Sequence, residues 1–193
     1  MARLAPHPLP ADIRPATSDL AYARASADDP ASAVMTDLRR SRAVTIRGQE
    51  TLAAAERLMI GAGVRLLLVV NAAGAITGVV TYRDLTGEKA LAAAARERIA
   101  HAELAVVQVM TPAAAVEALD YRAVTHARVR DLIALMYERG RQHALVTETD
   151  DSDRPVVRGI FSITQIGRQL GVPIEANERA QSFAEIEHLI AHA

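Results

Sequence analysis

The chain arranges its apolar and polar residues in blocks that predict a helix followed by two strands. Thr51 precedes a stretch with apolar residues at helical spacing, which predicts an N-cap at Thr51 and a helix end at Gly61 and Gly63. Leu66 to Val70 is continuously apolar, as expected for a strand covered on both faces. After a turn at residues 72–74, Ile76 to Thr81 predicts a second strand. The predicted buried stripe of the helix is Leu52, Ala55, Leu58, Met59 and Ala62.

The same order of elements returns further along the chain. The predicted elements outside the block above are a strand from Arg42 to Ile46, helices over residues 85–101 and 127–139, and strands over residues 143–147 and 156–162. The segment that starts at Gly63 aligns without a gap with the one that starts at Gly140, and Val34-Met35-Thr36 aligns with Val109-Met110-Thr111. The period of roughly 75 to 80 residues is too long for a solenoid repeat and predicts two tandem small domains.

The chemistry is concentrated where the last strand of each repeat ends. Gly78-Val79-Val80-Thr81 is followed by Asp84, and Gly159-Ile160-Phe161-Ser162 is followed by Gln165 at the same spacing. A carboxylate accepts two hydrogen bonds from a vicinal diol, so Thr81 and Asp84 suit a ribose. Ser162 and Gln165 form a weaker version, since an amide lacks charge. The alternative is that Thr81 and Asp84 only cap the helix that follows.

These motifs, in this order and twice over, resemble a tandem CBS-domain pair, the Bateman module. The resemblance covers residues 32–171 and departs from the family pattern at Arg47, at Gln165 and over residues 119–129. It implies an α/β (α+β) fold of two β-α-β-β-α repeats packed through their sheets, here with a C-terminal helix in addition.

The resemblance also implies a site and a function. The protein would bind an adenosine-containing ligand (AMP, ADP, ATP or another adenosyl compound) between its repeats and regulate a separate partner protein, with no obligatory cofactor. Val44 and Ile46 would flank the base, and Arg65 and His143 would reach the phosphates. Each also has a structural interpretation: Val44 and Ile46 as core residues, Arg65 as a surface residue. Such modules commonly form homodimers through helix faces. The alternative function is a structural dimerisation module without a physiological nucleotide.

Composition narrows the class of protein. The net charge of −1 argues against a nucleic-acid or anionic-membrane surface, and two Phe, four Tyr and no Trp offer little stacking area for single-stranded nucleic acid. The absence of Cys excludes thiolate metal sites, and no run approaches the ~18 apolar residues of a membrane helix. Prolines near the amino terminus disfavour a signal peptide, so we expect a cytoplasmic protein. The excess of Ala and Arg is typical of a GC-rich, bacterial genome.

Neither a catalytic constellation nor a convincing metal site is present in the sequence. No nucleophile elbow, phosphate loop or spaced pair of catalytic carboxylates occurs, so we expect no enzyme. His188 and His192 are one helical turn apart without a third ligand, and the acidic run over residues 150–153 lacks the glycine of a calcium loop.

The predicted domain division has four parts. They are a flexible arm over residues 1–31, repeats over residues 32–105 and 106–172, and an extension over residues 173–193. We expect the arm to be dispensable, because its prolines and small residues build no core. The extension is predicted to hold a helix over residues 181–191 with an apolar stripe made of Phe183, Ile186, Leu189 and Ile190.

Overall fold

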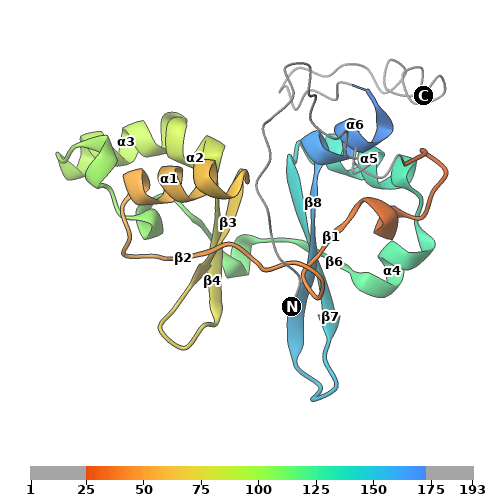
Figure 1. Ribbon diagram of the computed structural model, residues 1–193. Coiled ribbons are helices and arrows are strands. Elements are labelled where there is room, and N and C mark those ends of the chain that lie inside the picture. Colours follow the sequence, from red (N-terminus) through yellow and green to blue (C-terminus); the bar gives the residue numbers. More distant parts are fainter. Residues whose placement is uncertain (1–24, 173–193) are drawn as a thin grey trace, which may run out of the picture.

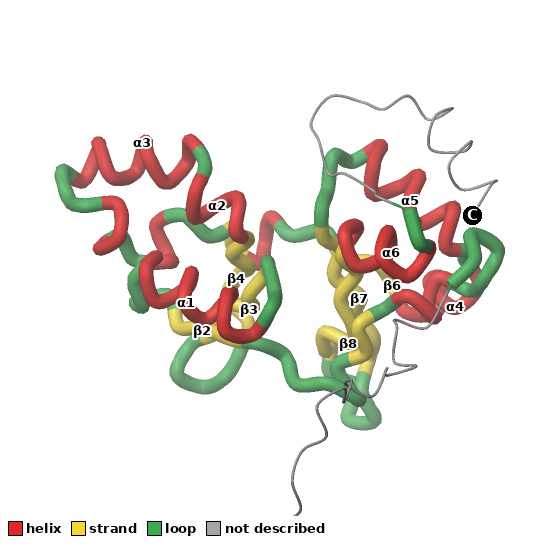
Figure 2. Tube along the Cα trace, turned by 45° about the horizontal axis from the view of Figure 1, so that its top comes forward, coloured by secondary structure: helices red, strands yellow, loops and turns green. Residues whose placement is uncertain are grey.

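The fold consists of two similar halves that face each other through their β-sheets. It was obtained as a computed structural model, in which residues 25–172 are described. Helices cover the outer face of each sheet, and the strands lie toward the middle of the molecule (Figures 1 and 2). The α/β fold of two tandem repeats predicted from the sequence is confirmed.

The first half follows the predicted order of elements. It contains β2 (Thr45–Arg47), α1 (Leu52–Ala62), β3 (Leu66–Val70), β4 (Ile76–Thr81), α2 (Tyr82–Thr86) and α3 (Glu88–Glu97). The N-cap prediction is confirmed, since the Thr51 side chain accepts a hydrogen bond from the Ala54 amide. Gly63 ends α1 with a left-handed φ of 65° that disfavours other residues.

The second half repeats this order. It contains β6 (Ala118–Asp120), α4 (Tyr121–His126), α5 (Val129–Glu138), β7 (His143–Thr149), β8 (Pro155–Ser162) and α6 (Ile163–Leu170). Four 3-10 turns join these elements, at residues Ala31–Val34, His101–Glu103, Val106–Gln108 and Ala113–Ala115.

Each half donates one short strand to the sheet of the other. β1 (Thr36–Asp37), at the start of the first repeat, pairs antiparallel with β8, while β5 (Thr111–Pro112), at the start of the second, pairs antiparallel with β4. The sheets therefore have the orders β1-β8-β7-β6 and β2-β3-β4-β5. This exchange ties the halves together in both directions.

The repeated glycines make the exchange possible. A Cβ atom on Gly78 would collide with the backbone oxygen of Thr111, and one on Gly159 would collide with the Met35 side chain. The two sequence motifs, Met-Thr and the glycine of the last strand, are therefore the two sides of one contact.

Three apolar clusters hold the molecule together. One lies under the helices of each half, and a third lies between the sheets, with Leu66, Leu68, Val79 and Leu145 buried in it. Because strand residues alternate in direction, Val79 and Leu145 face the opposite sheet while Val80 and Val146 face the helices of their own half.

Several predicted boundaries were wrong. The single helix expected over residues 85–101 is two helices, which meet at Gly87, and the first of them begins at Tyr82 because Thr81 caps it. The strand expected from Arg42 to Ile46 is Thr45–Arg47, and α1 continues past Gly61. Ala62 is exposed at the last turn of α1, outside the buried stripe.

Residues 25–31 of the predicted flexible arm lie against the second half. The amides of Val129 and Arg130, at the start of α5, donate to the carbonyls of Asp29 and Ala27. In the first half the Leu52 amide donates in the same way to Leu104. Residues 25–31 therefore cap α5, and a truncation before Ala31 removes two helix-capping acceptors. The rest of the arm and the helix expected over residues 181–191 lie outside the described residues.

Candidate functional site

A cleft opens between the two sheets where β4 ends and β7 begins. Its volume is about 190 Å³. The first half contributes Thr81 and Arg83, and the second half contributes Glu117, Arg141, Gln142 and His143. The exchanged strand β5 contributes Thr111 to the same cleft. Apolar side chains of Leu66, Val79, Val116 and Leu145 complete the wall, so the cleft combines an apolar surface with a basic rim, and both halves are needed to form it.

Thr81 and Asp84 are joined in a capping box at the start of α2. One carboxylate oxygen of Asp84 accepts from the Thr81 amide (2.9 Å) and from its hydroxyl (2.7 Å), and the Asp84 amide donates back to the hydroxyl (3.2 Å). The other carboxylate oxygen lies 3.5 Å from the Lys89 Nζ, which also donates to the Met110 carbonyl. Thr81 lines the cleft, whereas Asp84 does not line it and is held against Thr81 by these hydrogen bonds.

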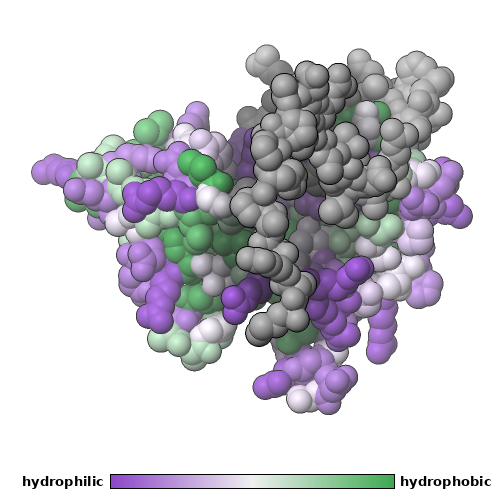
Figure 3. Space-filling view, in the orientation of Figure 1, coloured by the Kyte–Doolittle hydropathy of each residue, from purple (hydrophilic) through white to green (hydrophobic). Residues whose placement is uncertain are grey.

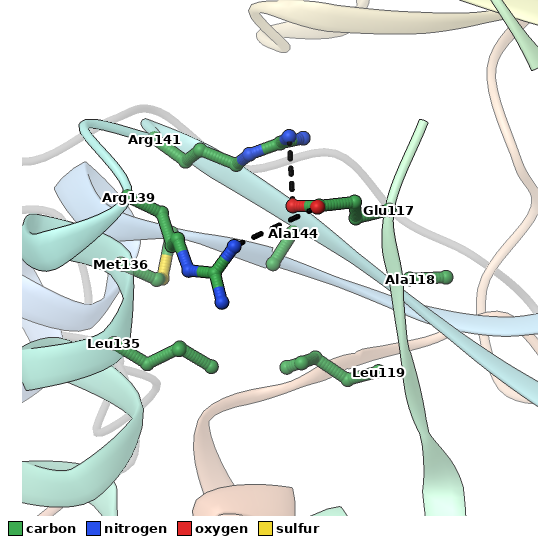
Figure 4. Close-up of a pocket in the computed structure, with 8 residues that line it drawn as sticks. All are labelled: Glu117, Ala118, Leu119, Leu135, Met136, Arg139, Arg141 and Ala144. Atoms are coloured by element: carbon green, nitrogen blue, oxygen red, sulfur yellow. Dashed lines mark hydrogen bonds and ion pairs between the residues drawn. The ribbon is translucent and has the colours of Figure 1, made fainter. Parts of the chain in front are cut away.

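A second, more apolar pocket adjoins the cleft. It has a volume of about 220 Å³ and shares Glu117 and Arg141 with the cleft. Figure 4 shows Leu119 and Leu135 facing each other across it, with Glu117 directed toward two arginines at the rim. The pocket lies between β6, the end of α5 and β7, so its position is set by the backbone of the second half.

The rim of this pocket carries three charges. The Glu117 carboxylate lies 3.6 Å from the Arg139 Nη1 and 3.0 Å from the Arg141 Nη2. Two guanidinium groups and one carboxylate leave a net positive charge at the junction of the pocket and the cleft.

His143 lies in the cleft as a neutral residue. Burial lowers its pKa, the nearby Arg65 charge lowers it further, and the resulting pKa is about 4. Its buried Nδ1 has no hydrogen-bond partner. At neutral pH His143 can therefore exchange a hydrogen bond with a ligand but brings no charge.

The predicted base contacts lie elsewhere. Val44 and Ile46 pack in the cluster under the helices of the first half, whereas Thr81 and Val79 line the cleft on the other face of the same sheet. The structure therefore brings Thr81 and His143 together but separates them from Val44 and Ile46. Arg65 is exposed beside the cleft and acts on His143 through its charge.

The second predicted pair lies in the symmetry-related position. Ser162 is the N-cap residue of α6, but its side chain makes no hydrogen bond to the helix. At the end of β8 it lies opposite His143 of the neighbouring strand β7. The Gln165 amide oxygen accepts from the Thr36 hydroxyl at 3.4 Å, a long contact. Thr36 belongs to β1, as Thr111 belongs to β5, so each predicted pair is close to the strand exchanged from the other repeat.

Sequence reasoning missed Thr111, Glu117, Arg139 and Arg141. The two arginines could have been found from the alignment of the two repeats, in which Arg141 aligns with Val64 and Arg139 aligns with Ala62. A charge that one copy has and the other lacks is not needed for the shared backbone, and it is therefore a candidate for function.

A larger cavity suits a different chemistry. It lies between the ends of the two sheets and has a volume of about 690 Å³, and its lining contains no ionisable residue. It therefore offers no counter-charge to a phosphate. Among residues 25–172 no cluster of side chains could hold a metal ion. Within the same residues, every helix is too short or too polar to cross a membrane.

Comparisons with known proteins agree with this architecture. The sequence model of the CBS domain matches residues 31–90. A CBS-domain containing protein from Agrobacterium tumefaciens is 21% identical, with a TM-score of 0.53, and the match covers 77% of this chain and 97% of that one. An uncharacterized conserved protein from Pyrococcus horikoshii is 16% identical with a TM-score of 0.54, over 82% of this chain and 99% of that one.

At these identities the two structures show a shared fold. No curated protein matches the chain. The family match shows a CBS domain over residues 31–90, and the internal repeat with the shared fold supports a tandem CBS module.

Proposed function

We propose that this protein is a regulatory module that binds an adenosine-containing nucleotide between its repeats and modulates a separate partner. The observation that carries the proposal is the shared cleft: Thr81, held by Asp84, faces Arg141 and His143 of the other half. Because both halves line the cleft, a ligand in it would fix their relative position. That is the physical requirement for sensing a ligand.

The size of the site supports a nucleoside. The cleft and the adjoining pocket, about 190 and 220 Å³, are each smaller than the ~300 Å³ at the lower end of ligand sites. A ligand that spans both, with a flat apolar part and a polar part, fits better than one confined to either.

Each part of the ligand has suitable neighbours. The apolar pocket, with Leu119 and Leu135, suits the base, and the Thr81 hydroxyl, held by Asp84, suits the ribose. Arg139 and Arg141 suit the phosphates, because a guanidinium donates two parallel hydrogen bonds to a phosphate. Arg65 and His143, the phosphate contacts predicted from the sequence, are also at the cleft: His143 lines it as a neutral residue, and Arg65 is close enough to lower the His143 pKa.

A second candidate function is a dimerisation module without a physiological nucleotide. It is favoured by the capping box, which already gives Thr81 and one Asp84 oxygen their partners. It is also favoured by the exposed hydrophobic residues, of which Ile60 and Leu91 are 70% and 60% exposed. In Figure 3 hydrophobic residues gather on the first half near α1 and β2.

Ligand binding separates the two candidates. Adenosine, AMP, ATP and S-adenosylmethionine should be titrated against the protein in a thermal-shift assay, with guanosine as the control. A ligand at 100 times its Kd stabilises the folded state by ~2.7 kcal/mol, so the melting temperature should rise by several degrees. If no adenosine compound raises the melting temperature at millimolar concentration, the dimerisation module is the better description.

We further propose that the protein is a homodimer in which the exposed hydrophobic residues of the first half are buried. Light scattering should give twice the chain mass, and Leu91→Glu should shift it to the monomer. A monomeric mass for the unaltered protein at micromolar concentration would rule the dimer out.

A further inference from the structure

Glu117 holds both arginines at the rim of the apolar pocket. It lies just before β6, while Arg139 ends α5 and Arg141 precedes β7, so three separate elements bring the charges together. Figure 4 shows the carboxylate directed at both guanidinium groups above the apolar part of the pocket. In this arrangement the arginines are already occupied by an anionic group of the protein itself.

The fold does not require these charges. The repeat alignment equates Arg139 with Ala62 and Arg141 with Val64. β6 pairs with β7 in the same register as β2 pairs with β3, which equates Glu117 with Val44. The first half builds the same backbone with no charge at any of the three positions. The arginines and their carboxylate therefore belong to the site that faces Thr81, and not to the repeat as such.

The interaction is weak enough to be exchanged. The side chains of Glu117, Arg139 and Arg141 are 64%, 54% and 38% exposed. Ion pairs at such exposure contribute at most ~1 kcal/mol, because water and salt screen them. A phosphate offers the same type of acceptor oxygen with more negative charge, so it competes for both guanidinium groups at small cost.

We propose that Glu117 is an internal competitor of the ligand's phosphate. In the empty site it pairs with Arg139 and Arg141, and it releases them when a phosphate enters. This inference rests on the proposed function and narrows it: the site takes a phosphate-bearing adenosine in preference to neutral adenosine or to a cationic S-adenosyl compound.

The test is a calorimetric titration of three probes into four proteins. The probes are adenosine, AMP and S-adenosylmethionine, and the proteins are the full chain and its Glu117→Gln, Arg141→Gln and Glu103→Gln variants. Glu103 is exposed on the first half, so Glu103→Gln removes the same charge away from the cleft. Equal melting temperatures would show that the variants fold alike.

Glu117→Gln should bind AMP about three to ten times more tightly, because the competing carboxylate is gone, whereas Arg141→Gln should bind it weaker by a similar factor. Adenosine affinity should stay the same in all four proteins, and Glu103→Gln should match the full chain. S-adenosylmethionine should bind no more tightly than adenosine.

Two failures are distinguishable. Adenosine and AMP binding with equal affinity, unaffected by either cleft variant, would overturn the role of Glu117 and leave the proposed function intact. The absence of binding by all three probes would overturn the proposed function and this inference with it.

Discussion

The two halves share one backbone plan and differ in where they place charge. The Met-Thr strand, the glycine it packs on and the apolar strands occur in both, because the exchange of strands requires them. Three charged or polar features occur in one copy only. Asp84 corresponds to Gln165 in the other copy, and His143 corresponds to Leu66. The arginines at the pocket rim correspond to apolar residues. Features common to both copies thus explain the fold, and differences between them indicate the function.

The difference extends to how the exchanged strands are held. In the second half Arg158 of β8 forms an ion pair with Asp37 of β1, lies 3.2 Å from the Glu148 carboxylate and stacks over the Tyr121 ring. The corresponding positions in the first half are Thr77 and Pro112, which carry no charge. The first half holds its exchanged strand by backbone pairing and packing, and the second half adds a buried ion pair.

The largest effect is expected at Arg158. Arg158→Met leaves Asp37 without its guanidinium partner and leaves Glu148 with only the exposed Arg39, so the free energy of unfolding should fall by about 3 kcal/mol. Thr77→Val, the matched change in the first half, should cost under about 1 kcal/mol. Urea denaturation of the two variants measures both. An equal loss of unfolding free energy in the two variants would mean that the ion pair does not contribute to stability.

The pH dependence of this loss provides a control. The hydrogen bond from Arg158 lowers the pKa of Asp37 below its ordinary value of 3.8. The contribution of Asp37 is therefore complete above that value and disappears as the pH falls through the lowered pKa. The difference in the free energy of unfolding between Arg158→Met and the unaltered protein should therefore become smaller below pH 3.8.

The next effect concerns ligand affinity. Asp84→Asn keeps an acceptor for the Thr81 amide but removes the charge, which makes the first site resemble the second. AMP binding should weaken roughly ten- to a hundredfold, the value of a charge-assisted hydrogen bond. Gln165→Ala should change the affinity little. A larger effect from Gln165→Ala would reverse the proposed assignment of the two sites.

A smaller difference is expected at the two glycines. Gly78→Ala places a methyl group against the backbone oxygen of Thr111, whereas Gly159→Ala meets the flexible Met35 side chain. Gly78→Ala should therefore destabilise by about 2 kcal/mol and Gly159→Ala by about half as much. Thermal unfolding of both variants tests which one is less stable. A less stable Gly159→Ala would show that the backbone of β5 moves away from an added methyl group more easily than the Met35 side chain does.

At neutral pH the smallest effect on stability is that of His143, because its contribution changes only below about pH 6.5. Its pKa of about 4 in the folded state lies below the ordinary 6.5, so the unfolded chain binds a proton first as the pH falls. Stability should decrease between pH 6.5 and 4, and His143→Leu, which copies Leu66, should flatten that decrease. If both proteins lose stability equally over this range, His143 is not the residue that titrates.

Much of the fold could be predicted because its signals are local. The strands Leu66–Val70 and Ile76–Thr81 match their predicted bounds, since each is a short apolar run closed by turn residues. The exchange of β1 and β5 could not be predicted, because a strand of two residues has no periodicity and its partner lies in the other repeat. The break at Gly87 was missed because the alanine-rich sequence that follows it favours one continuous helix.

The candidate site divides in the same way. The pairing of Thr81 with Asp84 follows from their spacing at a helix start, and the structure contains it as a capping box. The residues across the cleft depend on how the sheets face each other, so Glu117 and Arg141 were not predicted. Val44 and Ile46, which were predicted to flank the base, pack in the cluster under the helices of the first half.

The number of strong AMP sites per chain tests the account most directly. Asp84 and the arginine rim serve one cleft only, so isothermal titration calorimetry should give about one tight site per chain, which Asp84→Asn removes. Two sites of equal affinity per chain, or one tight site that survives Asp84→Asn, would contradict the assignment of nucleotide binding to the asymmetry between the halves.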